Sequence, residues 1–160
     1  MSDLLHNGFL LLIPVFVMNM VLYRILPDFF KPAQWDNIPK EVLIAENLFR
    51  YLSFLLPITM IIGFTSLRQK IGLALYLFGL LVYFSAWLIQ IKNKQDKYDK
   101  SIIIRGAPAY TPIIWLIGIG LLFDKTIFSS ITHNKAYFFV VIIFTVIHTY
   151  HAYLVVKNSG

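Results

Sequence analysis

The fold class of this chain is decided by residues 136–156, which read AYFFVVIIFTVIHTYHAYLVV. This stretch runs for 21 residues without a Lys, Arg, Asp or Glu. An α-helix needs about 20 consecutive apolar residues to cross the hydrocarbon core of a bilayer. The stretch therefore predicts a helix that spans a membrane.

Four other windows have the same character, each free of charged residues over 17 to 21 positions: 4–23, 51–67, 71–91 and 106–123. Together the five windows predict an all-α integral membrane protein, a bundle of five transmembrane helices in one polytopic domain, 1–160. We expect the helices at about 8–26, 39–67, 71–91, 108–123 and 136–156. Gly72 and Gly79 place two small residues on one face of the third helix, which favours close contact with a neighbour.

The composition agrees with this class of protein. Hydrophobic residues make up 58% of the chain and charged residues 14%, whereas soluble domains are about 25% charged. This balance excludes a disordered chain, a nucleic-acid-binding domain and a small secreted scaffold. Cysteine is absent, which excludes disulfide exchange and thiolate metal sites. We expect an integral multi-pass protein of a cell membrane or a bacterial inner membrane.

The basic residues predict the orientation, because Lys and Arg concentrate in cytoplasmic loops. If the N-terminus is outside, ten basic residues are inside: Arg24, Lys31, Lys40, Arg50, Lys92, Lys94, Lys97, Lys100, Arg105 and Lys157. Four are outside: Arg68, Lys70, Lys125 and Lys135. The sequence therefore predicts an N-out, C-in topology, and this bias also accounts for the net charge of +6 without a nucleic-acid partner.

Polar residues gather in the half of each helix that this topology places near the cytoplasm. The outer halves are mainly Leu, Ile, Phe, Val and Gly. This pattern predicts a polar pocket that faces the cytoplasm above an apolar floor. The candidate ligand-binding residues are Asn19, Asn47, Arg50, Ser53, Tyr110, Thr145 and His151.

Two pairs of ionisable residues follow helical spacing. Glu46 and Arg50 are four residues apart and can pair along one helix, although Arg50 is also suited to hold an anionic headgroup. His148 and His151 are three residues apart, on one side of another helix. His148 and Glu46 are the candidate catalytic residues, with His148 as general acid or base. The spacing of the histidines also suits a metal ion, but no motif supports one, and we expect neither a metal nor a cofactor.

These observations favour a small multi-pass membrane protein that binds a hydrophobic or amphipathic small molecule, or a lipid, in the predicted pocket. One alternative is an intramembrane enzyme that acts on a lipid-like substrate through His148. Another is a non-catalytic assembly or immunity-type protein whose polar residues only hold the helices together. The expected partners are membrane lipids and the small molecule, with assembly into a homo-oligomer left open.

Overall fold

A computed structural model describes residues 6–25, 38–92, 102–126 and 133–158 of the chain. The N-terminal half contains the 3-10 helix η1 (Gly8–Leu12), α2 (Ile13–Tyr23), α3 (Lys40–Leu55), the 3-10 helix η4 (Leu56–Thr59) and β1 (Met60–Ile62). The remainder contains α4 (Leu67–Lys92), α5 (Ile102–Tyr110), α6 (Pro112–Leu122), β2 (Phe123–Thr126) and α7 (His133–Asn158).

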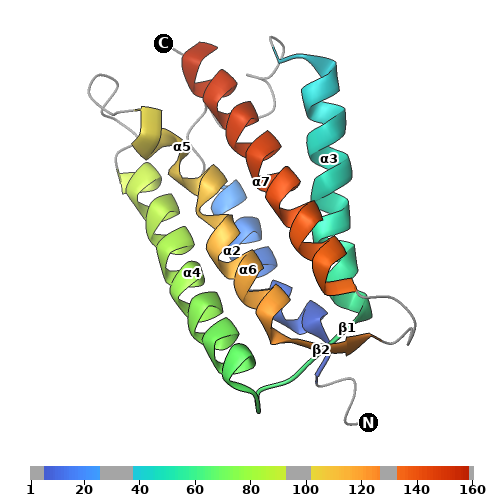
Figure 1. The fold of residues 1–160 in the computed structure, drawn as a ribbon. Helices are drawn as coiled ribbons and strands as arrows, with labels where there is room; N and C mark the ends of the chain where they lie inside the picture. Colours follow the sequence, from blue (N-terminus) through green and yellow to red (C-terminus); the bar gives the residue numbers. More distant parts are fainter. Residues whose placement is uncertain (1–5, 26–37, 93–101, 127–132, 159–160) are drawn as a thin grey trace.

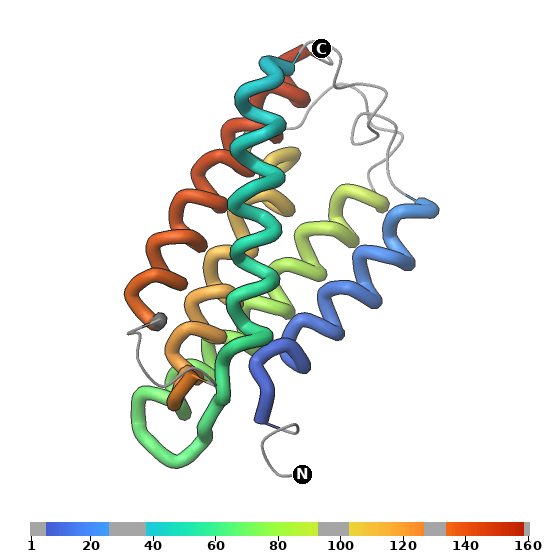
Figure 2. Tube along the Cα trace, turned by 90° about the vertical axis from the view of Figure 1, so that its right-hand side faces the viewer, coloured from blue at the N-terminus to red at the C-terminus, as the bar shows by residue number. Residues whose placement is uncertain are grey.

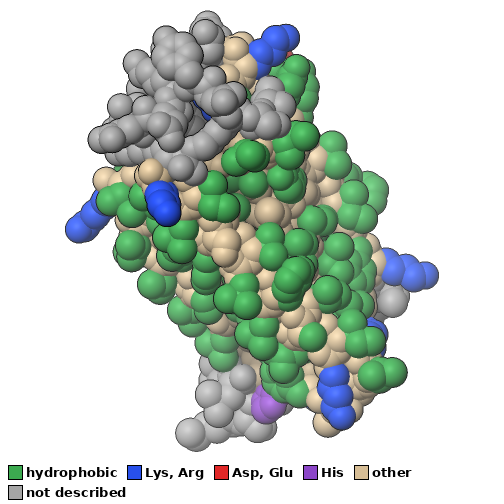
Figure 3. Space-filling model, turned by 90° about the vertical axis from the view of Figure 1, so that its left-hand side faces the viewer, with side chains coloured by type: hydrophobic (Ala, Val, Ile, Leu, Met, Phe, Trp, Pro, Cys, Tyr) green, Lys and Arg blue, Asp and Glu red, His purple; other side chains and the backbone are tan. Residues whose placement is uncertain are grey.

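The described residues form five helical segments, as the charge-free windows predict. Four are long and apolar enough to cross a membrane: Lys40–Thr59, Leu67–Lys92, Ile103–Leu122 and Asn134–Asn158. The fifth, Gly8–Tyr23, is apolar but shorter. Large hydrophobic side chains also cover much of the exterior, and Figure 3 shows one such face with few Lys or Arg side chains. The chain is therefore an integral, multi-pass, all-α membrane protein.

The long helices run roughly alongside one another between two ends of the bundle. In Figures 1 and 2, β1 and β2 lie at one end, and the C-terminal end of α7 lies at the other. Helix α3 packs along α7, and α6 contacts both α4 and α7. Asn7 belongs to the strand end, because it forms an antiparallel bridge with Ile61. Asn7 and Asn158 consequently lie at opposite ends of the bundle.

The centre of the core is the contact between α4 and α6, where Trp115, Leu116 and Ile119 are almost completely buried. Two glycines allow these helices to approach closely. A Cβ atom on Gly79 would lie 2.4 Å from the backbone nitrogen of Trp115, and one on Gly118 would lie 2.5 Å from that of Tyr76. In lipid, small residues at such contacts let backbones pack closely, as the spacing of Gly72 and Gly79 predicts.

The second helix is shorter than the sequence predicts. We expect it to reach residue 67, but it ends at Thr59, and Met60–Ile62 pairs in an antiparallel ladder with Phe123–Thr126. Pro57 lies in the first turn of η4, the 3-10 helix that closes this segment, and the Asn7 side chain donates a 2.7 Å hydrogen bond to the carbonyl of Ile58. The third helix then begins at Leu67 rather than at 71.

The fourth predicted helix begins earlier, at residue 102 rather than 108, and therefore contains Pro108 in its interior. Proline has no N–H, so the carbonyl of Ile104, four residues earlier, loses its helical partner. The buried Gln90 side chain on α4 replaces this partner, because its Nε2 donates a 2.6 Å hydrogen bond to that carbonyl. This contact ties α5 to α4 near the C-terminal end of the bundle.

Candidate functional site

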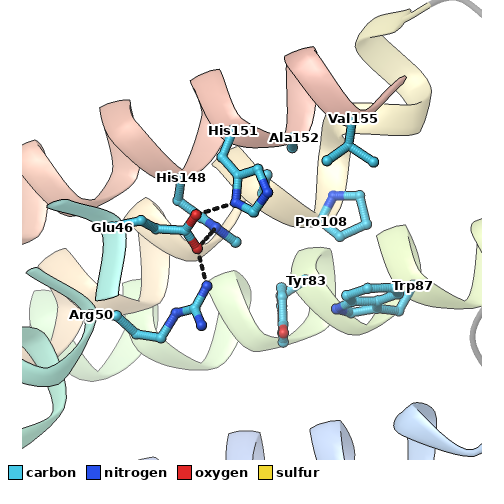
Figure 4. A pocket seen from close by; sticks show the side chains of 10 residues that line it. Glu46, Arg50, Tyr83, Trp87, Pro108, His148, His151, Ala152 and Val155 are labelled. Atoms are coloured by element: carbon cyan, nitrogen blue, oxygen red, sulfur yellow. Dashed lines mark hydrogen bonds and ion pairs between the residues drawn. The ribbon is translucent and has the colours of Figure 1, made fainter. Parts of the chain in front are cut away.

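The candidate site is centred on Glu46, whose side chain is buried although it is ionisable. Glu46 lies on α3 and is 1% exposed, because α3 packs along α7. Its Oε1 forms a 2.9 Å hydrogen bond with Nδ1 of His148, and its Oε2 contacts Nδ1 of His151. The Arg50 guanidinium pairs with Oε1 from one turn along α3. One carboxylate therefore connects three side chains (Figure 4).

Helical spacing explains how each side chain reaches this point. Residues three or four positions apart on a helix are neighbours on its surface. This rule places Arg50 beside Glu46 on α3, and His148 beside His151 on α7. Because the two helices pack against each other, the histidine pair meets the carboxylate. The burial of Glu46 shows that its side chain faces the interior of the bundle.

A cavity of about 90 Å³ adjoins this cluster. It is lined by Glu46, Arg50, Tyr83, Trp87, Pro108, Ala109, His148, His151, Ala152 and Val155, which come from α3, α4, α5 and α7. Sites that enclose a whole drug-sized ligand start at about 300 Å³, whereas a single water needs only ~10–15 Å³. The cavity therefore has room for a small polar group and the first atoms of an attached chain.

The ring of His148 is fixed on two sides. Its Nδ1 is bonded to Glu46, and Phe144 stacks on its face with the ring centroids 5.2 Å apart and the planes 12° from parallel. Its side chain is nevertheless 28% exposed, whereas that of His151 is 6% exposed. His148 is thus the more accessible of the two histidines.

Two of the other predicted residues form hydrogen bonds with residues that line the cavity. Asn19 on α2 accepts a 2.7 Å hydrogen bond from the hydroxyl of Tyr83. Asn47 accepts a 3.4 Å hydrogen bond from Nη1 of Arg50. These contacts fix the positions of Tyr83 and Arg50, while neither asparagine is itself among the lining residues.

Three predicted residues lie elsewhere. Thr145 donates to the carbonyl of Val141 on its own helix, at 2.9 Å, and Tyr110 donates to the carbonyl of Ile103, at 3.1 Å. Ser53 is fully buried, and its hydroxyl has no hydrogen-bond partner within the described part of the chain. None of the three lines the cavity.

The structure adds lining residues that the sequence analysis did not select, above all Tyr83 and Trp87. They are four residues apart on α4, so they share one face of that helix. Their spacing, in the half of the helix that carries Gln90, could have indicated in the sequence that both residues line the site. Ala109, Ala152 and Val155 gave no signal, since apolar residues are expected throughout membrane helices.

The described residues contain no group of three or more His, Cys, Asp or Glu side chains arranged to hold a metal ion. Comparisons with protein-family models, with curated proteins and with solved structures find no match to the chain.

Proposed function

We propose that the protein binds a small amphipathic molecule or a lipid, with the polar end of the ligand in the cavity beside Glu46. The single observation that carries this proposal is a cavity between four helices with one polar and one apolar side. The polar side is the cluster of Glu46, Arg50, His148 and His151, and the apolar side includes Trp87 and Val155. Such a combination suits a ligand that has a polar head and an apolar tail.

The cost of burying the cluster supports a functional role. Ionisable side chains within membrane helices cost several kcal/mol, and they commonly mark binding sites or pathways. The Glu46–Arg50 pair lowers this cost, but an apolar pair of similar size would pack the same space without it. The partial exposure of Arg50 and His148 beside a cavity is what a purely structural cluster does not need.

The proposed binding is tested by filling the cavity. Ala152 lines it, whereas Ala136 is an exposed residue near the other end of α7. The full chain is purified in a mild detergent as wild type, Ala152→Phe and Ala136→Phe, and bound small molecules are identified by native mass spectrometry. We expect a molecule that is retained by the wild type and by Ala136→Phe and is lost from Ala152→Phe. The same bound molecules in all three would contradict the proposal.

A second candidate function is an intramembrane enzyme that acts on a lipid-like substrate. It is favoured by the 2.9 Å contact between Glu46 and Nδ1 of His148, because a carboxylate that orients an imidazole prepares its other nitrogen to take up a proton. In membranes that contain the protein, at least one lipid species should then change in abundance over time. Membranes containing His148→Asn should lack this change, and identical lipid profiles would refute the enzyme function.

For the orientation, we propose five crossings with the N-terminus outside and the C-terminus inside. The support is the excess of basic residues on the proposed inner side, together with the positions of Asn7 and Asn158 at opposite ends of the bundle. The cavity lies toward the end that holds Val155, so this orientation places it in the cytoplasmic half of the membrane.

A further inference from the structure

The hydrogen bond between Glu46 and His148 determines which nitrogen of His148 carries a hydrogen. An ionised carboxylate accepts hydrogen bonds and cannot donate one. With Glu46 ionised beside the Arg50 guanidinium, Nδ1 of His148 must be the donor in the 2.9 Å contact. In a neutral imidazole the other nitrogen is then an acceptor. Nε2 of His148 therefore presents a lone pair.

This lone pair is the polar group that His148 can offer to a molecule in the cavity. Nδ1 is used by Glu46, and Phe144 covers the face of the ring. Among the described residues, Glu46 is the hydrogen-bond partner of His148. The side chain also lines the cavity and is 28% exposed, so a ligand can reach its remaining edge.

The hydrogen-bond donors around the cavity are largely committed to protein partners. Tyr83 directs its hydroxyl hydrogen to Asn19, and Nδ1 of His151 contacts Glu46. The Arg50 guanidinium has five N–H groups and contacts Glu46 through Nη2 and Asn47 through Nη1. Arg50 can therefore still donate to a ligand, while its charge is balanced by Glu46.

We infer that the polar end of the ligand is an uncharged hydroxyl group, so that the ligand is a neutral lipid or long-chain alcohol. This inference rests on the proposed binding function. A hydroxyl can donate its hydrogen to Nε2 of His148 and accept one from Arg50, and these are the roles that His148 and Arg50 offer to a ligand. A carboxylate or phosphate would place a negative charge beside a lone pair and an ion pair that is already balanced. Among the residues that the structure describes there, no unbalanced positive charge would offset the cost of removing the anion from water. An ether oxygen would leave Nε2 without a donor.

The test compares ligands that differ only at the polar end. The full chain in nanodiscs is labelled with a long-chain alcohol that carries a diazirine on its chain, and the label is competed with hexadecanol, hexadecyl methyl ether or palmitate. Loss of one hydrogen bond to a partly buried acceptor corresponds to about a fivefold or larger loss of affinity. We expect label on peptides that line the cavity, and hexadecanol to compete at least about fivefold better than the other two compounds.

The matched variant is His148→Asn, because an asparagine amide can still donate to Glu46 from near the position of Nδ1 but has no atom at the position of Nε2. It should fold, bind the label weakly and lose the preference for the alcohol. Retention of the preference in this variant would overturn the inference. So would palmitate or the ether competing as well as hexadecanol in the wild type, although the proposed binding function would then stand. If no probe labels the cavity in a saturable way, the binding function fails as well.

Discussion

Glu46 accepts contacts from three side chains while its own carboxylate is almost completely buried. In Glu46→Ala, the Arg50 charge and both histidines lose their partner in a region where water is scarce. Breaking a buried pair by removing one partner costs about 3–5 kcal/mol. We expect a loss of this size in the free energy of unfolding, measured by denaturant titration in mixed micelles.

The matched control is Glu41→Ala, because Glu41 is exposed in the first turn of the same helix. Its effect should stay within about 0.5 kcal/mol, as at most surface positions. Equal stability of Glu46→Ala and Glu41→Ala would mean that the cluster contributes nothing to the fold. The residues would then have to be explained by the ligand alone.

Four residues of the site could be predicted from the sequence, because their spacing along each helix places them in pairs on one face. Glu46 with Arg50, and His148 with His151, are neighbours on a helix surface by period alone. The sequence could not distinguish these four from Ser53, Thr145 and Tyr110, which have a similar expected depth in the membrane but do not line the cavity. Depth follows from topology, whereas the direction in which a side chain points follows from how helices are rotated against each other. That rotation is fixed by tertiary packing.

At the scale of a helix, Pro108 and Gln90 form a compensating pair. Gln90→Leu should leave the carbonyl of Ile104 without a partner, which costs about 1–3 kcal/mol. In a Pro108→Ala background, the restored backbone N–H can bond that carbonyl, so the same change should cost less. A double-mutant cycle on the free energy of unfolding should give a coupling of about 1 kcal/mol. Additive effects would show that the contact is not compensatory.

Two helix glycines should respond oppositely to alanine. At Gly79 a Cβ would lie 2.4 Å from the backbone of Trp115, so Gly79→Ala must separate α4 from α6. Overpacking of this kind costs about 1–3 kcal/mol. At Gly106 a Cβ would meet nothing within 4 Å, so Gly106→Ala should be neutral or stabilise by up to about 1 kcal/mol. Thermal unfolding in detergent measures both, and a Gly79→Ala protein as stable as Gly106→Ala would contradict the close contact.

The helices themselves were predictable, but several of their ends were not, and the end of the second helix shows why. A window without charges cannot distinguish an apolar helix from a short apolar strand, and Met60–Ile62 continues the apolar run of the second helix. The strand forms because β2, about sixty residues later, supplies the hydrogen bonds, and because Asn7 contacts the preceding carbonyl. Both partners are remote in sequence, so the pattern of residues around Met60–Ile62 does not indicate them.

For the whole molecule, the two ends of the bundle differ in construction. The strand end is closed by backbone pairing and by the Gln69 side chain, which accepts from the backbone of Thr65 and Ser66 and donates to Asp124. The other end holds the cavity and its partly exposed polar residues. Among the described residues, the strand end is held by backbone pairing, whereas the other end holds a polar cavity, and this difference suits a protein that admits a ligand from one side of the membrane.

The proposed orientation can be tested residue by residue because the chain contains no cysteine. Lys125 on β2 and Lys157 near the end of α7 are both exposed and lie at opposite ends of the bundle. In intact cells, a membrane-impermeant thiol reagent should label Lys125→Cys directly and Lys157→Cys only after permeabilisation. This follows from the excess of basic residues at the α7 end, which positive-inside sorting holds in the cytoplasm. The reverse pattern would place the cavity on the outer side, and its ligand would then enter from outside the cell.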